Sequence, residues 1–307
     1  MSKTGWIFPG QASQKVGMGQ DIFDNSSIAK EYFDLAEKIM GCDIKSIIFD
    51  GPEEKLKMTE YTQPAIYIIS VLIGTILIKK GIRPDYLAGH SLGEYSALTI
   101  GGSFDFETGL LLVKTRSESM AKASLLEKGK MAAIIGMDIE QLEIICSSYS
   151  SSKKAVIANY NAPGQLVISG NEKAVEDIMQ IAKKNGARLT VELKVSGAFH
   201  SPLMSPAREQ LAELINSLEI SDTICPLFSN VDAIPIMKSE EIKNSLIKQL
   251  ESPVQWTNSV LGMKNLGVNS FIEIGPGSVL KGLNKRIDKS LTTQCVGTYE
   301  ELEKVIV

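Results

Sequence analysis

Short apolar runs alternate with longer amphipathic stretches along most of the chain. The apolar runs have strand length and end at glycine, proline or polar residues, which predicts strands at 5–9, 85–89, 226–229 and 270–275. The longer stretches predict helices at 26–40, 64–80, 92–100, 105–127, 239–250 and 256–266, then a C-terminal helix, strand and helix. Residues 11–19 are polar and glycine-rich, which predicts a loop. This alternation favours a parallel sheet covered by helices on both faces.

The middle third of the chain follows a different order. Its pattern predicts a strand, a helix, two strands, a helix and a strand at 131–137, 138–149, 155–161, 165–170, 171–186 and 187–193. Asn171 is placed to cap the second helix and Gly186 to end it. The order β-α-β-β-α-β is the split unit of ferredoxin-like domains. We therefore expect a ferredoxin-like domain over residues 129–194, inserted into a larger α/β domain formed by 1–128 and 195–307.

Hydropathy and composition exclude several classes of protein. The most apolar stretch, Pro64 to Ile78, is shorter than the roughly 18 residues of a spanning helix, so we expect a buried core helix. The N-terminus lacks the apolar core of a signal peptide. A net charge of −4 without a long basic run argues against nucleic-acid binding. The four scattered cysteines suit reduced thiols in a cytoplasmic protein, not disulfides or a zinc site.

The segment "GHSLGE" at 89–94 carries the first candidate chemistry. It places Ser91 in a G-x-S-x-G pattern between a predicted strand and a predicted helix. This is the nucleophile elbow of α/β-hydrolase-like folds, in which a tight turn exposes the serine hydroxyl. The backbone N–H of Leu92 and the helix N-terminus would then favour an oxyanion at the same place. A turn that merely contains serine is the alternative interpretation.

A serine nucleophile needs a base, and the chain has only two histidines. His90 adjoins Ser91, where adjacent side chains diverge, so we interpret it as a structural, partly buried histidine. His200 in "SGAFHSPLM" is therefore the candidate base. Asp138 and Asp177 could orient it but belong to the inserted domain, so a backbone carbonyl or an amide is an equally open alternative.

Several further segments, taken together, carry a resemblance to a known family. They are "FPGQASQKVGMG" (8–19), "GHSLGEYSAL" (89–98), "RSESM" (116–120), "IANYNAPGQLVISG" (157–170), "GAFHSPLM" (197–204), "ESPVQW" (251–256) and "EIGPGSVL" (273–280). In this order they resemble the malonyl-CoA:acyl carrier protein transacylases of fatty acid synthesis. The resemblance covers essentially the whole chain.

This resemblance implies a role for each matching residue. Ser91 would carry the acyl group as an ester, and His200 would serve as general base and then acid. Gln11 would contribute its backbone N–H to the oxyanion hole alongside that of Leu92. The backbone carbonyl of Gln249 would hold the His200 imidazole in orientation, which removes the need for a triad aspartate.

The resemblance also implies how the acyl group is selected. On its own, Arg116 would be a solvated charge on a polar helix. In the family the matching arginine pairs with the free malonyl carboxylate, which a planar guanidinium binds with two hydrogen bonds. Phe199 resembles the residue that favours malonyl over branched chains, although Ala198 stands where many relatives have proline. Asn161 is expected near the site, at the junction with the small domain.

The implied reaction is ping-pong transfer from malonyl-CoA to the phosphopantetheine thiol of acyl carrier protein. It implies no metal and no cofactor, no nucleic-acid or membrane partner, and a monomer. Three alternatives stay open: a thioester or ester hydrolase with the same Ser91 and His200, a non-catalytic module that docks carrier proteins, and an acyltransferase serving a polyketide synthase.

Overall fold

The larger of two sheets joins strands that lie far apart in the sequence. The computed structural model describes residues 3–149 and 154–305. The sheet has the order β10-β9-β1-β2-β7-β8, with β1 (Lys3–Phe8), β2 (Tyr86–Gly89), β7 (Leu227–Phe228), β8 (Pro235–Ile236), β9 (Val268–Ile274) and β10 (Thr292–Val296). Neighbouring strands are parallel except at the edge, where β8 runs antiparallel to β7. The predicted strands are confirmed, but the sheet is mixed because of β8, which was not predicted.

Helices cover both faces of this sheet, as predicted. They are α1 (Gln20–Asn25), α2 (Ser27–Met40), α3 (Ile44–Phe49), α4 (Glu53–Leu56), α5 (Thr59–Lys79), α6 (Gly93–Ile100), α7 (Phe106–Leu126), the 3-10 helix η1 (Pro202–Met204), α10 (Ser205–Ser217), α11 (Ser239–Gln249), α12 (Trp256–Asn265), α13 (Val279–Ile287) and α14 (Tyr299–Glu303). Alternate residues of β1 enter different cores: Trp6 and Phe8 pack with α5 and α7, and Ile7 packs with α12 and α13. The short helices α1, α3 and α4 were not predicted because they are too short to show a period.

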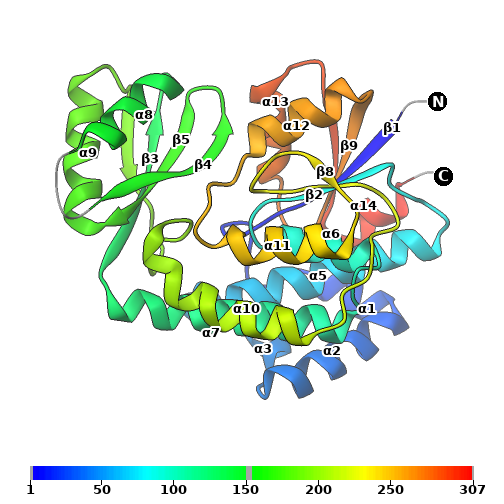
Figure 1. The fold of residues 1–307 in the computed structure, drawn as a ribbon. Coiled ribbons are helices and arrows are strands. Elements are labelled where there is room, and N and C mark those ends of the chain that lie inside the picture. The colour runs from blue at the N-terminus through cyan, green and yellow to red at the C-terminus, as the bar shows by residue number, and fades with distance from the viewer. Residues whose placement is uncertain (1–2, 150–153, 306–307) are drawn as a thin grey trace.

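A smaller sheet stands beside the larger unit (Figure 1). It has the order β4-β5-β3-β6 and is antiparallel throughout. The element order is the predicted one: β3 (Gly129–Ile135), α8 (Ile139–Ser148), β4 (Ala155–Ala162), β5 (Gln165–Asn171), α9 (Glu172–Lys184) and β6 (Leu189–Glu192). Gly186, at φ 102°, follows the end of α9 as predicted. The predicted cap is wrong in detail, because the Asn171 side chain bonds Lys154 and Glu127 instead of the α9 backbone.

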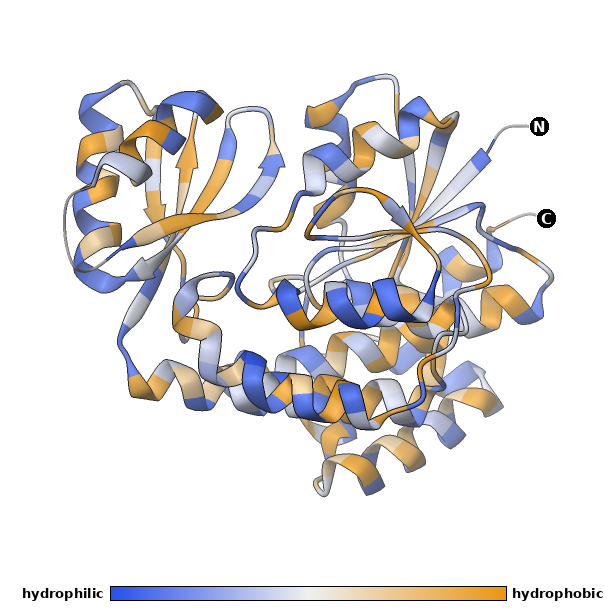
Figure 2. Cartoon of the chain, viewed as in Figure 1, coloured by the Kyte–Doolittle hydropathy of each residue, from blue (hydrophilic) through white to orange (hydrophobic). Residues whose placement is uncertain are grey.

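The long apolar helix α5 lies in the core. By length and composition alone it is the one described helix that could cross a membrane, but 78% of its most apolar window is buried inside the protein. It begins at Thr59, ahead of the predicted start, so Pro64 lies inside it. Burial of residues on both sides of Pro64 outweighs the one hydrogen bond that proline removes. Figure 2 shows the contrast with the outer helices, whose exposed faces are hydrophilic.

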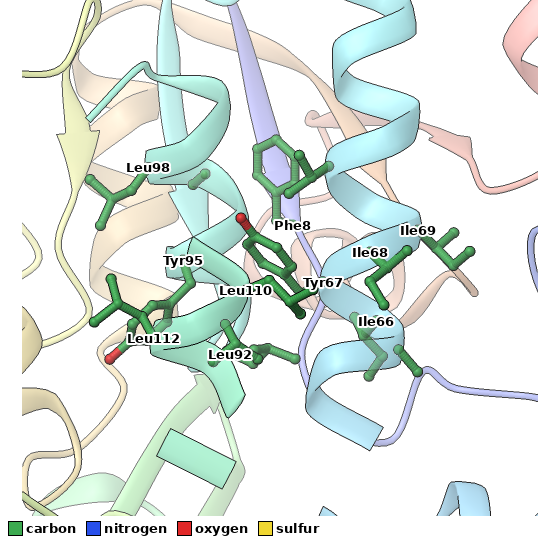
Figure 3. Packing of buried hydrophobic residues seen from close by; sticks show 14 of the residues in the cluster. Phe8, Ile66, Tyr67, Ile68, Ile69, Leu92, Tyr95, Leu98, Leu110 and Leu112 are labelled. Atoms are coloured by element: carbon green, nitrogen blue, oxygen red, sulfur yellow. The ribbon is translucent and has the colours of Figure 1, made fainter. Parts of the chain in front are cut away.

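Helix α5 packs against the elements that carry the serine turn (Figure 3). The Tyr67 ring lies in this core, and its hydroxyl bonds Thr99 Oγ1 on α6 at 2.8 Å and the carbonyl oxygen of Phe106 on α7 at 3.1 Å. Phe8 of β1 and Leu110 of α7 complete the cluster. Helix α6, which follows the serine turn, is therefore held in place by a packed core.

All four cysteines are free thiols.

Replacing Leu110 by alanine tests this packing. The Leu110 side chain is 0% exposed, so Leu110→Ala should lower the free energy of unfolding by about 2–5 kcal/mol. Leu125→Ala on the same helix is the matched control, because Leu125 is 87% exposed and its replacement should change stability by less than about 0.5 kcal/mol. Urea denaturation followed by circular dichroism measures both; equal effects would contradict the packing described here.

Candidate active site

The serine turn connects β2 to α6 in a strained conformation. Ser91 has φ 52°, in the left-handed region that non-glycine residues rarely occupy. Both flanking glycines are required: a Cβ on Gly89 would lie 1.9 Å from the carbonyl carbon of Gly93, and one on Gly93 would lie 2.0 Å from the carbonyl oxygen of Phe8. The backbone therefore holds Ser91 at the amino end of α6.

His200 lies directly against the serine hydroxyl. Ser91 Oγ is 2.8 Å from His200 Nε2. His200 Nδ1 donates to the carbonyl oxygens of Gln249 at 2.9 Å and Ser252 at 3.0 Å. Carbonyls only accept, so the ring proton is on Nδ1 and Nε2 is free to accept the serine proton. His200 lies in the turn before η1 and has φ 56°, a left-handed conformation from which its ring contacts Ser91.

Among the described residues, the imidazole is oriented by carbonyls and not by a carboxylate. Asp138 caps α8, and Asp177 bonds Lys173 and Tyr149 within the small unit. Burial first, and then the Arg116 charge, lower the pKa of His200 to about 3. The ring is therefore neutral, and able to accept a proton, at neutral pH.

Arg116 is buried beside the nucleophile, so the interpretation as a solvated charge is wrong. It is 1% exposed, and its Nη2 donates to Ser91 Oγ and to Gln249 Oε1, each at 3.0 Å. Its Nη1 donates to Gln63 Oε1 at 2.6 Å. Burial lowers the pKa of this guanidinium, which nevertheless stays charged. Its Nε has no partner and no carboxylate pairs with it in the part of the chain that the structure describes.

Gln11 and Leu92, whose backbone N–H groups are expected to form the oxyanion hole, lie beside Ser91. Leu92 is the N-cap residue of α6, and Gln11 lies in the loop after β1. Both line the same pocket as Ser91. Within residues 3–149 and 154–305, neither N–H is used in another hydrogen bond, so both are available as donors.

The pocket is small and lies between the two units. Its volume is about 130 Å³, which suits a short acyl group. The large unit contributes most of the polar residues together with the apolar Ala12, Leu92, Met120 and Phe199, whereas the small unit and its connection contribute Asn159 and apolar side chains. The lining residues are Gln11, Ala12, Gln63, His90, Ser91, Leu92, Arg116, Met120, Met131, Asn159, Leu193, Val195, Phe199 and His200.

Asn161 and His90 form a contact between the two units, next to the pocket. His90 Nε2 is 2.8 Å from Asn161 Oδ1, and the His90 ring centroid is 5.7 Å from that of Trp256. Burial lowers the pKa of His90. His90 thus has a hydrogen-bond partner, as expected for a structural histidine. Asn161 contacts His90, which lines the pocket, and is not itself a lining residue.

Comparison with known proteins places this geometry in a family. A family model for the acyl transferase domain matches residues 5–301. The malonyl CoA-acyl carrier protein transacylase of Bacillus subtilis is 42% identical over 307 residues, 100% of this chain and 97% of that protein. The chain belongs to the acyl transferase family. The resemblance to its malonyl-CoA:acyl carrier protein transacylases is thereby confirmed.

Solved structures of this family share the fold of the whole chain. The acyl carrier protein S-malonyltransferase of Vibrio cholerae aligns with a TM-score of 0.96 and 40% identity, over 99% of this chain and 100% of that one. A malonyl-transacylase in complex with the acyl-carrier protein of a type II polyketide synthase aligns with a TM-score of 0.95 and 37% identity, over 98% of each chain.

Three polar residues of this acyl transferase site are given no role by the sequence analysis. Gln63 binds the Arg116 guanidinium, and Ser252 accepts from His200. Asn230 Oδ1 accepts from the Ser91 N–H at 2.7 Å, and its Nδ2 donates to the Gly89 carbonyl at 2.6 Å. Each is an ordinary residue type in an ordinary context, and only the fold brings it to the site.

Replacing Gly93 by alanine tests the backbone constraint of the elbow. The new methyl group would meet the β1 backbone, which cannot move without disturbing the sheet, so Gly93→Ala should cost about 3 kcal/mol or more of stability and abolish serine reactivity. Gly282→Ala is the matched control, because nothing lies within 4 Å of its Cβ position and alanine favours a helix by about 1 kcal/mol. Thermal unfolding compares the two; a stable Gly93→Ala protein would contradict the constraint.

Proposed function

We propose that this chain moves the malonyl group from malonyl-CoA to the phosphopantetheine thiol of acyl carrier protein, for fatty acid synthesis. One observation carries the proposal: a buried, carboxylate-free Arg116 donates to the hydroxyl of the elbow serine. A buried cation that no carboxylate contacts directly is costly, so the site favours an acyl group that brings a carboxylate. The names of the relatives agree with this substrate.

In the first half-reaction, Ser91 Oγ attacks the thioester carbonyl of malonyl-CoA and its proton passes to His200 Nε2. The Gln11 and Leu92 N–H groups donate to the oxyanion of the tetrahedral intermediate. When the intermediate collapses, the carbon–sulfur bond breaks and the coenzyme A sulfur leaves with the proton from His200. The product is a malonyl ester on Ser91.

The second half-reaction reverses these steps with a different thiol. The phosphopantetheine thiol gives its proton to His200 and attacks the ester carbonyl. The ester bond to Ser91 breaks, and Ser91 Oγ takes the proton back from His200. All of these steps use only groups of the chain and of the two substrates, so we propose that no metal or cofactor takes part.

Arg116 and Phe199 are the proposed determinants of acyl specificity. A malonyl carboxylate would accept from the Arg116 guanidinium, whereas an acetyl group would leave it unpaired. Phe199 lines the pocket directly before His200 and is buried, so its ring limits the room for a branch at the α-carbon.

We also propose acyl carrier protein as the acceptor and a finer description of the fold. A relative of 37% identity was solved with such a protein bound. Because that partner serves a polyketide synthase, transfer assays with carrier proteins of fatty acid and polyketide synthesis distinguish the two pathways.

The elbow between β2 and α6 supports an α/β-hydrolase-like large domain (1–128 and 195–307), and the strand order β4-β5-β3-β6 supports a ferredoxin-like insert (129–194). We expect a cytoplasmic monomer.

Mass spectrometry of the intact protein after brief exposure to malonyl-CoA tests the function. The wild type should gain one malonyl group, and Ser91→Ala should gain none, because the variant lacks the attacking oxygen. Release of free malonate at the rate of transfer would indicate a hydrolase instead. Unchanged function in Ser91→Ala would indicate a non-catalytic docking module.

Replacing Arg116 tests the selection of the acyl group. Arg116→Ala should lower kcat/KM for malonyl-CoA by roughly 10–100-fold, the loss of a charged hydrogen-bonding partner, while loading of acetyl-CoA falls less. Arg116→Lys keeps the charge but not the paired donors, and should restore only part of the preference. Steady-state coenzyme A release measures all three proteins, and an unchanged malonyl-to-acetyl ratio would contradict the role of Arg116.

A further inference from the structure

Glu94 is a buried carboxylate to which the proposed mechanism gives no role. It lies in the first turn of α6, three residues after Ser91, and is 0% exposed. Its Oε2 accepts from Gln249 Nε2 at 2.5 Å, and its Oε1 accepts from the Asn230 backbone N–H at 3.3 Å. Both oxygens therefore face donors, the arrangement that an ionised carboxylate satisfies.

We propose that Glu94 is a positioning residue: its carboxylate sets the orientation of the Gln249 side chain, and through it that of Arg116 and the nucleophile turn. The inference rests on the proposed function, since it concerns how the same site is held in its working geometry.

The two ends of the Gln249 amide face partners of opposite kinds. Its Nε2 donates to Glu94 and also to the Ser91 carbonyl oxygen at 3.0 Å, while its Oε1 accepts from Arg116 Nη2 at 3.0 Å. A carboxylate only accepts and a guanidinium only donates, so only one of the two amide orientations satisfies both. With Glu94 protonated or replaced by an amide, Nε2 loses its charged acceptor, and the orientation of the amide rests on the Ser91 carbonyl and Arg116 alone.

Gln249 then connects Glu94 to three parts of the site. Its side chain contacts the Ser91 carbonyl and Arg116, and its backbone carbonyl accepts from His200 Nδ1. The second Glu94 oxygen holds Asn230, whose side chain in turn binds the Ser91 N–H. The nucleophile, the base and the selecting cation therefore share one buried acceptor.

Glu94 also supplies negative charge near the buried guanidinium. The charged or titratable groups that face Glu94 are Arg116 from α7 and Tyr95 from α6. Helix α11 and the loop after β7 contribute neutral groups, including the Ser245 hydroxyl. Burial raises the pKa of Glu94 to about 7, against the hydrogen bonds from Gln249 and Asn230 and the Arg116 charge. Since the pKa of His200 is held near 3, loss of activity below about pH 7 would come from Glu94.

The test measures kcat/KM for malonyl-CoA and acetyl-CoA from pH 5.5 to 9. We compare the wild type with Glu94→Gln, Glu94→Asp and the matched control Glu273→Gln, a buried carboxylate that caps α13 and does not line the pocket. For malonyl-CoA, the wild type and Glu273→Gln should lose activity below about pH 7. Glu94→Gln should be roughly 10–100-fold slower at pH 8, from misplacement of the site, and lack this pH dependence. Its malonyl-to-acetyl ratio should fall, and Glu94→Asp should recover part of both.

The outcomes separate this inference from the proposed function. A Glu94→Gln protein with the wild-type ratio and pH profile would overturn the role of Glu94 while leaving malonyl transfer in place. If the Glu94 variants do not fold, a wild-type profile that is flat between pH 6 and 8 would overturn it equally. A wild type that forms no malonyl ester at any pH would remove the proposed function and this inference with it.

Discussion

The contact between the start of α6 and β1 is the constraint on which the site depends. At Gly93 the two backbones approach so closely that no Cβ fits between them. This contact fixes the axis of α6 and, with it, the strained turn that presents Ser91. The other groups of the site are then placed relative to this rigid turn: Arg116 from the long helix α7, His200 from the turn before η1, and Gln249 from the end of α11.

Burial gives the polar groups of the site their chemistry. Removed from water, the His200 ring is neutral and Arg116 contacts no carboxylate in the described chain, so each can interact with a group that the substrate brings. Neutral acceptors orient both of them: backbone carbonyls hold His200, and side-chain amides hold Arg116. Among the described residues that contact these acceptors, Glu94 adds a negative charge, and Gln249 stands between it and Arg116.

Local patterns in the sequence predict the parts of this arrangement that are local in the fold. The elbow is visible because a tight turn needs its glycines, and His200 is found because it is the only histidine free to act. The resemblance adds Arg116, whose own surroundings in the sequence point to a solvated charge. The roles of Ser252, which lies in a segment of the resemblance, and of Asn230 could not be found, since their contacts with the site arise from chain segments that meet only in the folded protein. The cap expected of Asn171 fails for the same reason, because a tertiary partner takes its side chain.

The two walls of the pocket differ in how freely they can change during evolution. The wall around Ser91 rests on backbone contacts in which even a methyl group is excluded. The wall from the small unit consists mainly of apolar side chains, such as Met131 and Leu193, with Asn159 as its polar member. Substitutions there can reshape the acyl chamber without disturbing the nucleophile. New acyl preferences are therefore more accessible through the small unit than through the turn that carries Ser91.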